Sequence, residues 1–211
     1  MSAIENPVDM VRDGYDRASL AYRGDTCDLE QSGYGHWLRR LEPRLESGAR
    51  VLDLGCGCGI PVAHELAQRY QVTGVDLSPV QIERAHALVP DAAFVCADMT
   101  EVDFDPASFD AVTAFYSIIN IPVDRQPELF RRIHRWLVPG GWLLAIVGRF
   151  PWTGVEPDFR GVKGVPMYWS HGSITDYRRW LTEAGFELDE EGVEPERGNP
   201  GFAVVIARAG V

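Results

Sequence analysis

The hydrophobic residues of this chain form short apolar runs that alternate with stretches in which apolar residues recur at helical spacing. Most of the runs are continuous, which is typical of strands covered on both faces. Helices are predicted to begin near Ile60, Ser78, Val123 and Ser173. This alternation favours a parallel, doubly wound α/β sheet. The predicted strands are Val51–Leu54, Val72–Val75, Ala93–Cys96, Ala111–Phe115, Trp142–Val147, Phe186–Leu188 and Phe202–Ala207.

Two segments outside this alternation predict additions to a single domain that spans residues 1–211. Residues 6–24 have roughly helical spacing with a weak amphipathic pattern, and a helix is predicted around residues 34–46. We expect residues 1–33 to form an N-terminal helical lid. The stretch 149–172 is rich in proline, glycine and aromatic residues. A long loop in a compact domain is usually functional, so this stretch is predicted to be a cover loop on the substrate side.

Composition and charge limit the classes of partner. The formal net charge is −11, and nucleic acid demands a dense positive surface, so we expect no nucleic-acid partner. No apolar run is long enough for a membrane helix and no signal peptide is recognisable, so a cytoplasmic protein without a membrane partner is expected, as a monomer or homodimer. The four cysteines are interpreted as reduced thiols, and no metal is expected.

The segment with the clearest chemistry is the glycine-rich turn after the first strand, Gly55-Cys56-Gly57-Cys58-Gly59, preceded by Asp53. Glycines at alternate positions allow a sharp turn and leave bare main chain where a nucleotide-type ligand can lie. Ligands in such sheets bind outside the carboxyl ends of the strands. Asp76 after the second strand and Asp98 after the third are therefore candidates for ligand contacts. Plainer alternatives are helix capping for Asp76 and a turn for Asp98.

Four motifs occur in order: Asp53-x-Gly55-x-Gly57-x-Gly59, Gly74-Val75-Asp76, Cys96-Ala97-Asp98-Met99 and Leu137-Val138-Pro139-Gly140-Gly141. Together they are similar to those of the class I S-adenosylmethionine-dependent methyltransferases, in particular the small-molecule (type 11) branch. The resemblance covers roughly residues 35–208. It implies a Rossmann-like, mostly parallel seven-stranded sheet with helices on both faces and an N-terminal helical cap.

The resemblance also implies a cofactor, S-adenosyl-L-methionine, which becomes S-adenosyl-L-homocysteine, and a small-molecule acceptor. Asp53 and the Gly55–Gly59 backbone, including Cys56, would lie beside the methionine part. Asp76 would bind the ribose, and Asp98 the adenine amino group. The remaining implied contacts are Leu77 and Met99 at the adenine, Phe115 and Tyr116 at the methionine end, and Tyr15 and Tyr22 from a closing helix.

Catalytic candidates come from the aromatic stretch. His171 can titrate near neutrality and is the best candidate for a general base, and Tyr168 is a candidate for orienting the substrate. The alternatives are a loop histidine bonded to backbone and a tyrosine that only packs. The aromatic content of this stretch favours an apolar or aromatic acceptor, as in secondary metabolism, methylated at oxygen, nitrogen or sulfur.

Two other functions use the same fold. An NAD(P)-dependent oxidoreductase would require glycine or alanine where Ile60 stands, which argues against that class. A non-catalytic cofactor-binding subunit would keep the same motifs, because fold does not establish function. Cofactor affinity without turnover would distinguish that subunit from an enzyme.

Overall fold

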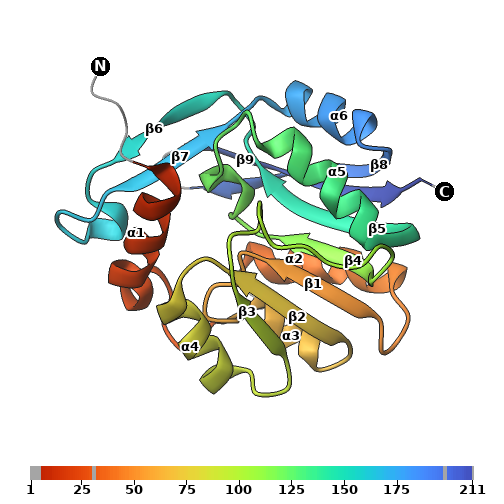
Figure 1. Cartoon of the computed structure of the whole chain (residues 1–211), viewed down its shortest axis with the longest axis horizontal. Coiled ribbons are helices and arrows are strands. Elements are labelled where there is room, and N and C mark those ends of the chain that lie inside the picture. The colour runs from red at the N-terminus through yellow and green to blue at the C-terminus, as the bar shows by residue number, and fades with distance from the viewer. Residues whose placement is uncertain (1–5, 30–31, 197–198, 211) are drawn as a thin grey trace.

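A seven-stranded sheet forms the centre of the computed structural model, which describes residues 6–29, 32–196 and 199–210 (Figure 1). The strand order is β3-β2-β1-β4-β5-β9-β8. The first five strands run parallel, while β9 is antiparallel to β5 and to β8. The predicted mostly parallel seven-stranded sheet is confirmed. The strands are Arg50–Leu54 (β1), Gln71–Asp76 (β2), Ala93–Cys96 (β3), Phe109–Ala114 (β4), Leu137–Val147 (β5), Phe186–Glu196 (β8) and Asn199–Ala209 (β9).

Helices cover both faces of the sheet. Two of them, α5 and α6, share one hydrophobic cluster with the sheet, and α2 and α3 share the cluster on the other face. Another helix, α4, lies beside β2 and β3 and also contacts α1. The helices are Pro7–Tyr22 (α1), Gly33–Leu41 (α2), Val62–Ala67 (α3), Pro79–Leu88 (α4), Gln126–Trp136 (α5) and Ile174–Glu183 (α6), with 3-10 turns Glu42–Arg44 (η1), Ile118–Asn120 (η2) and Phe159–Gly161 (η3).

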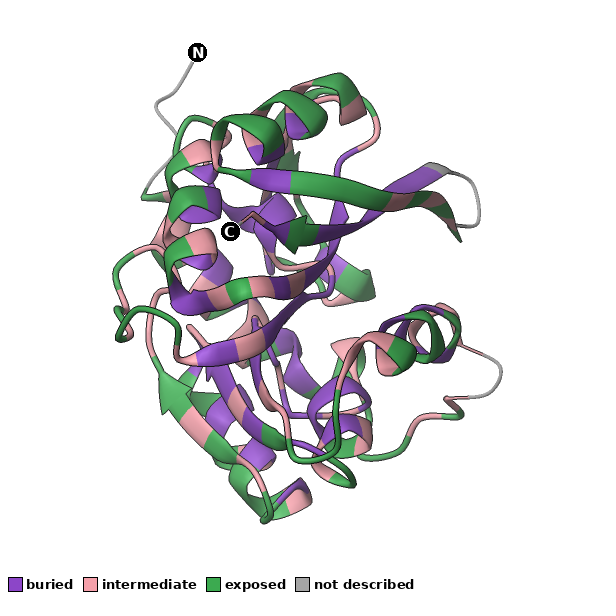
Figure 2. Cartoon of the chain, turned by 90° about the vertical axis from the view of Figure 1, so that its right-hand side faces the viewer, coloured by how far each residue is buried: buried purple, intermediate pink, exposed green. Residues whose placement is uncertain are grey.

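The strands alternate between the two hydrophobic clusters. In β1, Val51 belongs to the cluster under α2 and α3, while Leu52 and Leu54 belong to the cluster under α5 and α6. Successive side chains of a strand point to opposite faces, so a strand covered on both sides is apolar throughout. Figure 2 shows the buried positions along the strands and on the inner sides of the helices. Asp53, a charged residue within β1, is also buried.

Local capping fixes where two of the predicted helices begin. Ser78 caps α4 by accepting a hydrogen bond from the backbone of Gln81, and Ser173 forms a capping box with Asp176 at α6. Such side chains satisfy backbone N–H groups that have no partner within the helix. The predicted starts near Ser78 and Ser173 are confirmed.

The stretch 149–172 differs from the predicted loop. It contains a second sheet, in which Trp152–Glu156 (β6) pairs antiparallel with Met167–His171 (β7), with η3 between them. Thr153 Oγ1 and Ser170 Oγ lie 2.9 Å apart across this pair. Glycines and prolines obscured the strands in the sequence, because both residue types are depleted in strands.

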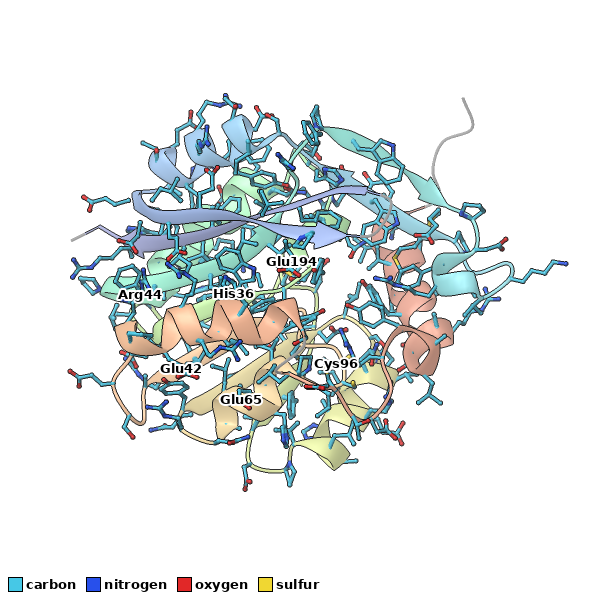
Figure 3. The ribbon with its side chains drawn as sticks, turned by 180° about the vertical axis from the view of Figure 1, so that it is seen from behind. His36, Glu42, Arg44, Glu65, Cys96 and Glu194 are labelled. Atoms are coloured by element: carbon cyan, nitrogen blue, oxygen red, sulfur yellow. The ribbon has the colours of Figure 1, made fainter. Side chains whose placement is uncertain are left out.

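The helix α1 lies beyond the carboxyl ends of the parallel strands (Figure 1). It contacts α4, β7 and η3. Seen from behind, Figure 3 shows α2 with Glu194 of β8 beside its N-terminal end, where Trp37 Nε1 donates to Glu194 Oε2 at 2.8 Å. Among the described residues, the helices are too short or too polar to cross a bilayer.

Candidate functional site

Two cavities meet at the carboxyl ends of the parallel strands. One of them is called the central cavity here, and the other, beside it, the glycine-turn cavity. The two cavities share Tyr22, Gly55, Gly57 and Phe115. They therefore form one continuous site around the glycine-rich turn.

The central cavity lies between α1 and the segments that follow β1 to β4. It is lined by Val8, Val11, Arg12, Tyr15, Tyr22, Gly55, Gly57, Asp76, Leu77, Ser78, Ala97, Asp98, Met99, Thr100, Phe115, Tyr116, Ser117, Asn120, Ile121, Pro122 and Arg125. The glycine-turn cavity is lined by Tyr22, Arg23, Tyr34, Asp53, Gly55, Cys56, Gly57, Cys58, Ile60, Pro61, Val62 and Phe115.

The predicted cofactor residues all line this continuous site. Ten of them lie around the central cavity, and Asp53 and Cys56 line only the glycine-turn cavity. This convergence follows from the sheet, because the carboxyl ends of neighbouring parallel strands meet at one edge. The ten are Tyr15, Tyr22, Gly55, Gly57, Asp76, Leu77, Asp98, Met99, Phe115 and Tyr116.

The glycines of the turn are required for different reasons. A Cβ on Gly55 would clash with Ser117, whose hydroxyl donates to Leu54 O at 2.6 Å. A Cβ on Gly57 would meet nothing within 4 Å. Both residues have positive φ, at 74° and 55°, which disfavours other side chains. Gly55 is therefore needed for packing, and only Gly57 keeps the cavity itself open.

Asp76 joins the ends of the first two strands. Its Oδ2 accepts from Gly57 N at 2.8 Å and its Oδ1 from Ser78 N at 2.9 Å. Burial raises the pKa of Asp76 to about 6, although the two backbone N–H groups act in the opposite direction. A carboxylate oxygen has more than one acceptor position, so Asp76 can still accept hydrogen bonds from hydroxyl groups in the cavity. Asp76 can thus cap the backbone at the start of α4 and contact a ligand at the same time.

Two polar atoms in the glycine-turn cavity lack partners. Asp53 Oδ1 accepts from Thr113 Oγ1 at 2.8 Å, but its Oδ2 is buried without a hydrogen bond among the described residues. Burial raises the pKa of Asp53 to about 7. Arg23 donates to Tyr34 Oη at 2.9 Å, while its Nε is buried without a partner. Buried polar atoms are normally hydrogen-bonded, so an unsatisfied acceptor and donor in one cavity indicate a ligand with both charges.

One side of α1 lines the central cavity. Its lining residues are Val8, Val11, Arg12, Tyr15 and Tyr22. These residues recur at helical spacing, which places them on one side of the helix. The Tyr15 hydroxyl donates to Asn120 Oδ1 at 3.2 Å, and Asn120 Nδ2 donates to Tyr168 O at 2.7 Å. Burial raises the pKa of Tyr15 well above its ordinary value, so this hydroxyl stays protonated at neutral pH.

Polar contacts hold α1 against α4. Ser78 Oγ donates to Asp16 Oδ1 at 2.5 Å, Ser19 Oγ donates to Gln81 Oε1 at 3.0 Å, and one Arg84 amino group donates to Ser19 Oγ at 2.6 Å. Ser78 is also the residue whose backbone N–H reaches Asp76. The helix that covers the cavity is thereby connected to the carboxylate within it.

The structure places the two catalytic candidates outside the central cavity. His171 lines a separate surface hollow with Trp152 and Trp180, and burial lowers its pKa. Tyr168 is buried in a small cluster with Phe159 and Met167. A general base must come within hydrogen-bond reach of the proton that it removes. Tyr15 and Asn120 line the central cavity instead.

Comparisons with known proteins agree on one family. A family model described as a methyltransferase domain matches residues 51–141. A 27-O-demethylrifamycin SV methyltransferase of Amycolatopsis mediterranei is 37% identical over 68% of this chain and 56% of its own length. The phosphoethanolamine N-methyltransferase 3 of Arabidopsis thaliana is 35% identical over 68% of this chain and 30% of its own length. The chain belongs to the class I S-adenosylmethionine-dependent methyltransferase family.

The fold is shared with a solved methyltransferase. Magnesium protoporphyrin IX methyltransferase from Synechocystis, solved with bound S-adenosylhomocysteine, superposes with a TM-score of 0.72 at 16% identity, over 97% of this chain and all of that one. This methyltransferase chain spans only about a third to just over half the length of the two curated relatives. The relatives therefore leave the acceptor open.

The described residues fit the cofactor of the methyltransferase family. S-adenosylmethionine has an ammonium and a carboxylate at its methionine end, and the glycine-turn cavity holds the unsatisfied Asp53 Oδ2 and Arg23 Nε. Its ribose needs an acceptor, which Asp76 supplies beside open space at Gly57. Sequence reasoning missed Arg23, because only the packing of α1 brings this residue to the glycine turn. Its position directly after Tyr22 was the one available signal.

Proposed function

We propose that this protein transfers a methyl group from S-adenosylmethionine to an oxygen, nitrogen or sulfur atom of a small molecule. The observation that carries the proposal is the continuous site itself. The glycine turn offers an unsatisfied acid and an unsatisfied arginine, the end of β2 beside it offers Asp76, and the cavity under α1 extends to the segment after β4. These features match a zwitterionic amino-acid part, a sugar and a separate acceptor.

In the proposed complex, Arg23 binds the methionine carboxylate and Asp53 the ammonium, while Asp76 accepts from the ribose hydroxyls. Asp98 and Met99 border the adenine, with Leu77 on the other side. Asp98 Oδ1 is already held by Thr100 N and Thr100 Oγ1, both at 2.8 Å, so its orientation is fixed before the ligand binds. A prearranged carboxylate loses little side-chain freedom on binding.

The cofactor supplies an activated methyl group on a sulfonium ion. The residues of the chain have to position the acceptor and exclude water. Tyr15 and Tyr22 meet edge to face with ring centroids 5.1 Å apart, and Tyr34 stacks on Phe115 at 5.1 Å. Aromatic faces stabilise a nearby cation by about 0.5–2 kcal/mol each. The Tyr15 hydroxyl donates its own proton to Asn120. We therefore assign its oxygen the role of receiving a hydrogen bond from the small molecule that is to be methylated.

The helix α1 is proposed to act as the lid of the site, with its position set by contacts to α4. The link from Asp16 through Ser78 to Asp76 would connect binding of the ribose with closure of this helix. The apolar side chains Val8, Val11 and Ile121 would contact the acceptor. The printed names of the two relatives describe small-molecule acceptors, which supports the same class here.

The proposal is tested by incubating the protein with S-adenosylmethionine and a metabolite library, and by searching for products heavier by one methylene unit. We expect such products with the wild-type protein, and less product with Asp76→Asn at subsaturating S-adenosylmethionine. Calorimetry with S-adenosylhomocysteine and with NADH runs in parallel. Affinity for NADH alone would favour an oxidoreductase, and affinity for S-adenosylhomocysteine without products would favour a non-catalytic subunit.

A further inference from the structure

The central cavity has opposite charges at its two ends. Its lining follows the strand order, with Asp98 after β3, Asp76 after β2, the glycine turn after β1, and Asn120 to Arg125 after β4. Neighbouring strands are about 4.8 Å apart, so Asp98 and the segment after β4 are separated by on the order of 14 Å. Carboxylates therefore line the end assigned to the cofactor, and the end beyond Asn120 has arginines.

Two arginines from different elements line this cavity. Arg12 comes from α1, where Asp9 Oδ1 and Asp13 Oδ1 lie 2.9 and 3.1 Å from its two amino groups. Arg125 directly precedes α5, and its guanidinium has no hydrogen bond or ion pair with the described residues. In a chain with a net charge of −11, most described arginines pair with carboxylates, whereas Arg125 is exposed at the rim of the cavity without such a pair. Its guanidinium is therefore available to an anionic group.

Other features of this end agree with an anionic ligand. Arg125 is the N-cap residue of α5, and the N-terminal end of a helix is the positive end of its dipole. Glu128, the acid in the first turn, is paired with Arg131 at 2.8 Å rather than with Arg125. Both carboxylates in the lining, Asp76 and Asp98, belong to the opposite end.

We infer that the methyl acceptor has an anionic group, a carboxylate or a phosphate ester, on the side away from its nucleophilic atom. This inference rests on the proposed function. The anionic group binds Arg125 with Arg12 beside it, and the apolar body of the acceptor lies on Val8, Val11 and Ile121. The nucleophile then points back toward Tyr15 and the glycine turn. Such a two-ended arrangement orients the acceptor, because a charged anchor at one end fixes which atom faces the cofactor.

The test measures binding of small probes to the protein saturated with S-adenosylhomocysteine. Benzoate and phenyl phosphate are the anionic probes, and benzamide and benzyl alcohol are their neutral counterparts. We expect at least one anionic probe to bind about tenfold more tightly than its neutral counterpart, because a hydrogen bond to a charged group has roughly that effect. A preference for benzoate indicates a carboxylate, and a preference for phenyl phosphate indicates a phosphate ester.

The control is Arg131→Gln, which removes a charge from the same helix at a position paired with Glu128. Arg125→Gln should abolish the preference for the anion, while Arg131→Gln should retain it. Equal binding of both probe types, or equal effects of the two variants, would overturn the inference. Binding of S-adenosylhomocysteine is measured first, so failure of the proposed function is seen separately from failure of this inference.

Discussion

The carboxylate of Asp76 accepts a hydrogen bond from the backbone N–H of Gly57 at 2.8 Å. This bond connects the end of β2 to the turn after β1, and it crosses between the two strands that begin the doubly wound sheet. A residue proposed to bind the ribose is therefore also part of the framework that shapes the glycine turn. Substitutions at either residue are expected to affect the same ligand.

Asp76→Asn should weaken binding of S-adenosylhomocysteine by about tenfold or more, because each hydrogen bond to a charged group contributes about 1.5–3 kcal/mol. The measurement is calorimetry at pH 7.5. Asp91→Asn, at an exposed turn after α4, is the matched control and should bind as wild type. Equal affinities for the two variants would remove Asp76 from the site.

The pH dependence of binding provides a second measurement at Asp76. Burial raises its pKa to about 6 in the free protein, so below that pH the carboxyl group is increasingly protonated. A cation bound nearby favours the ionised form, and binding then releases a proton. We expect affinity for S-adenosylmethionine to fall as the pH drops from 7.5 to 5, and Asp76→Asn to flatten this slope. A slope unchanged in the variant would assign it to another group.

Asp53 should affect the stability of the free protein in a defined direction. Its pKa is raised by burial from 3.8 to about 7, so the native state holds a proton that the unfolded state has already lost. The stability contributed by this group is fully present below pH 3.8 and is lost as the pH rises through about 7. The melting temperature of Asp53→Asn, relative to wild type, should therefore increase between pH 4.5 and 7.5. A constant difference would contradict the raised pKa.

Alanine substitutions at Gly57 and Gly48 distinguish the effect of backbone strain on stability from the effect of a side chain on ligand binding. Both have positive φ, at 55° and 78°, and a Cβ on either would meet nothing within 4 Å. Alanine at each should destabilise the fold by about 1–2 kcal/mol, the usual effect of this conformation. Only Gly57→Ala should also weaken S-adenosylhomocysteine binding, since only Gly57 lines the cavities. Comparable affinities in both variants would place the ligand elsewhere.

His171→Ala and Tyr15→Phe test which residue contacts the acceptor. His171 lies in a different hollow, so its removal should leave turnover within about twofold of wild type. Tyr15→Phe keeps the ring and removes the hydroxyl that bonds Asn120, and we expect kcat to fall about three- to tenfold, the effect of one neutral hydrogen bond. The reverse order of effects would restore the histidine as the general base.

Sequence reasoning predicted those parts of the site that depend on the ends of the parallel strands. Asp53, Asp76 and Asp98 each lie within or next to a strand, and the sheet brings strand ends together without further information. The sequence did not predict contacts that depend on how separate elements pack. Arg23, directly after α1, reaches the site only because α1 docks across it, and that docking uses polar contacts such as Asp16 with Ser78, which have no periodic pattern.

The aromatic stretch 149–172 shows the same limit. Its composition indicated a cover over the substrate, yet the backbone forms β6 and β7, and Tyr168 packs into a small cluster beneath α1. Whether a segment forms a strand depends on its cross-strand neighbours, and the sequence alone does not specify which residues of this stretch pair. The placement of His171 away from the central cavity follows from the same hairpin.

The most direct measurement is a crystal structure of this protein with S-adenosylhomocysteine bound. The account predicts the ribose hydroxyls within hydrogen-bond distance of Asp76, main chain of Gly57 against the ligand, and the amino-acid end between Asp53 and Arg23. A ligand bound elsewhere, or an amino-acid end directed away from Arg23 and Asp53, would contradict it.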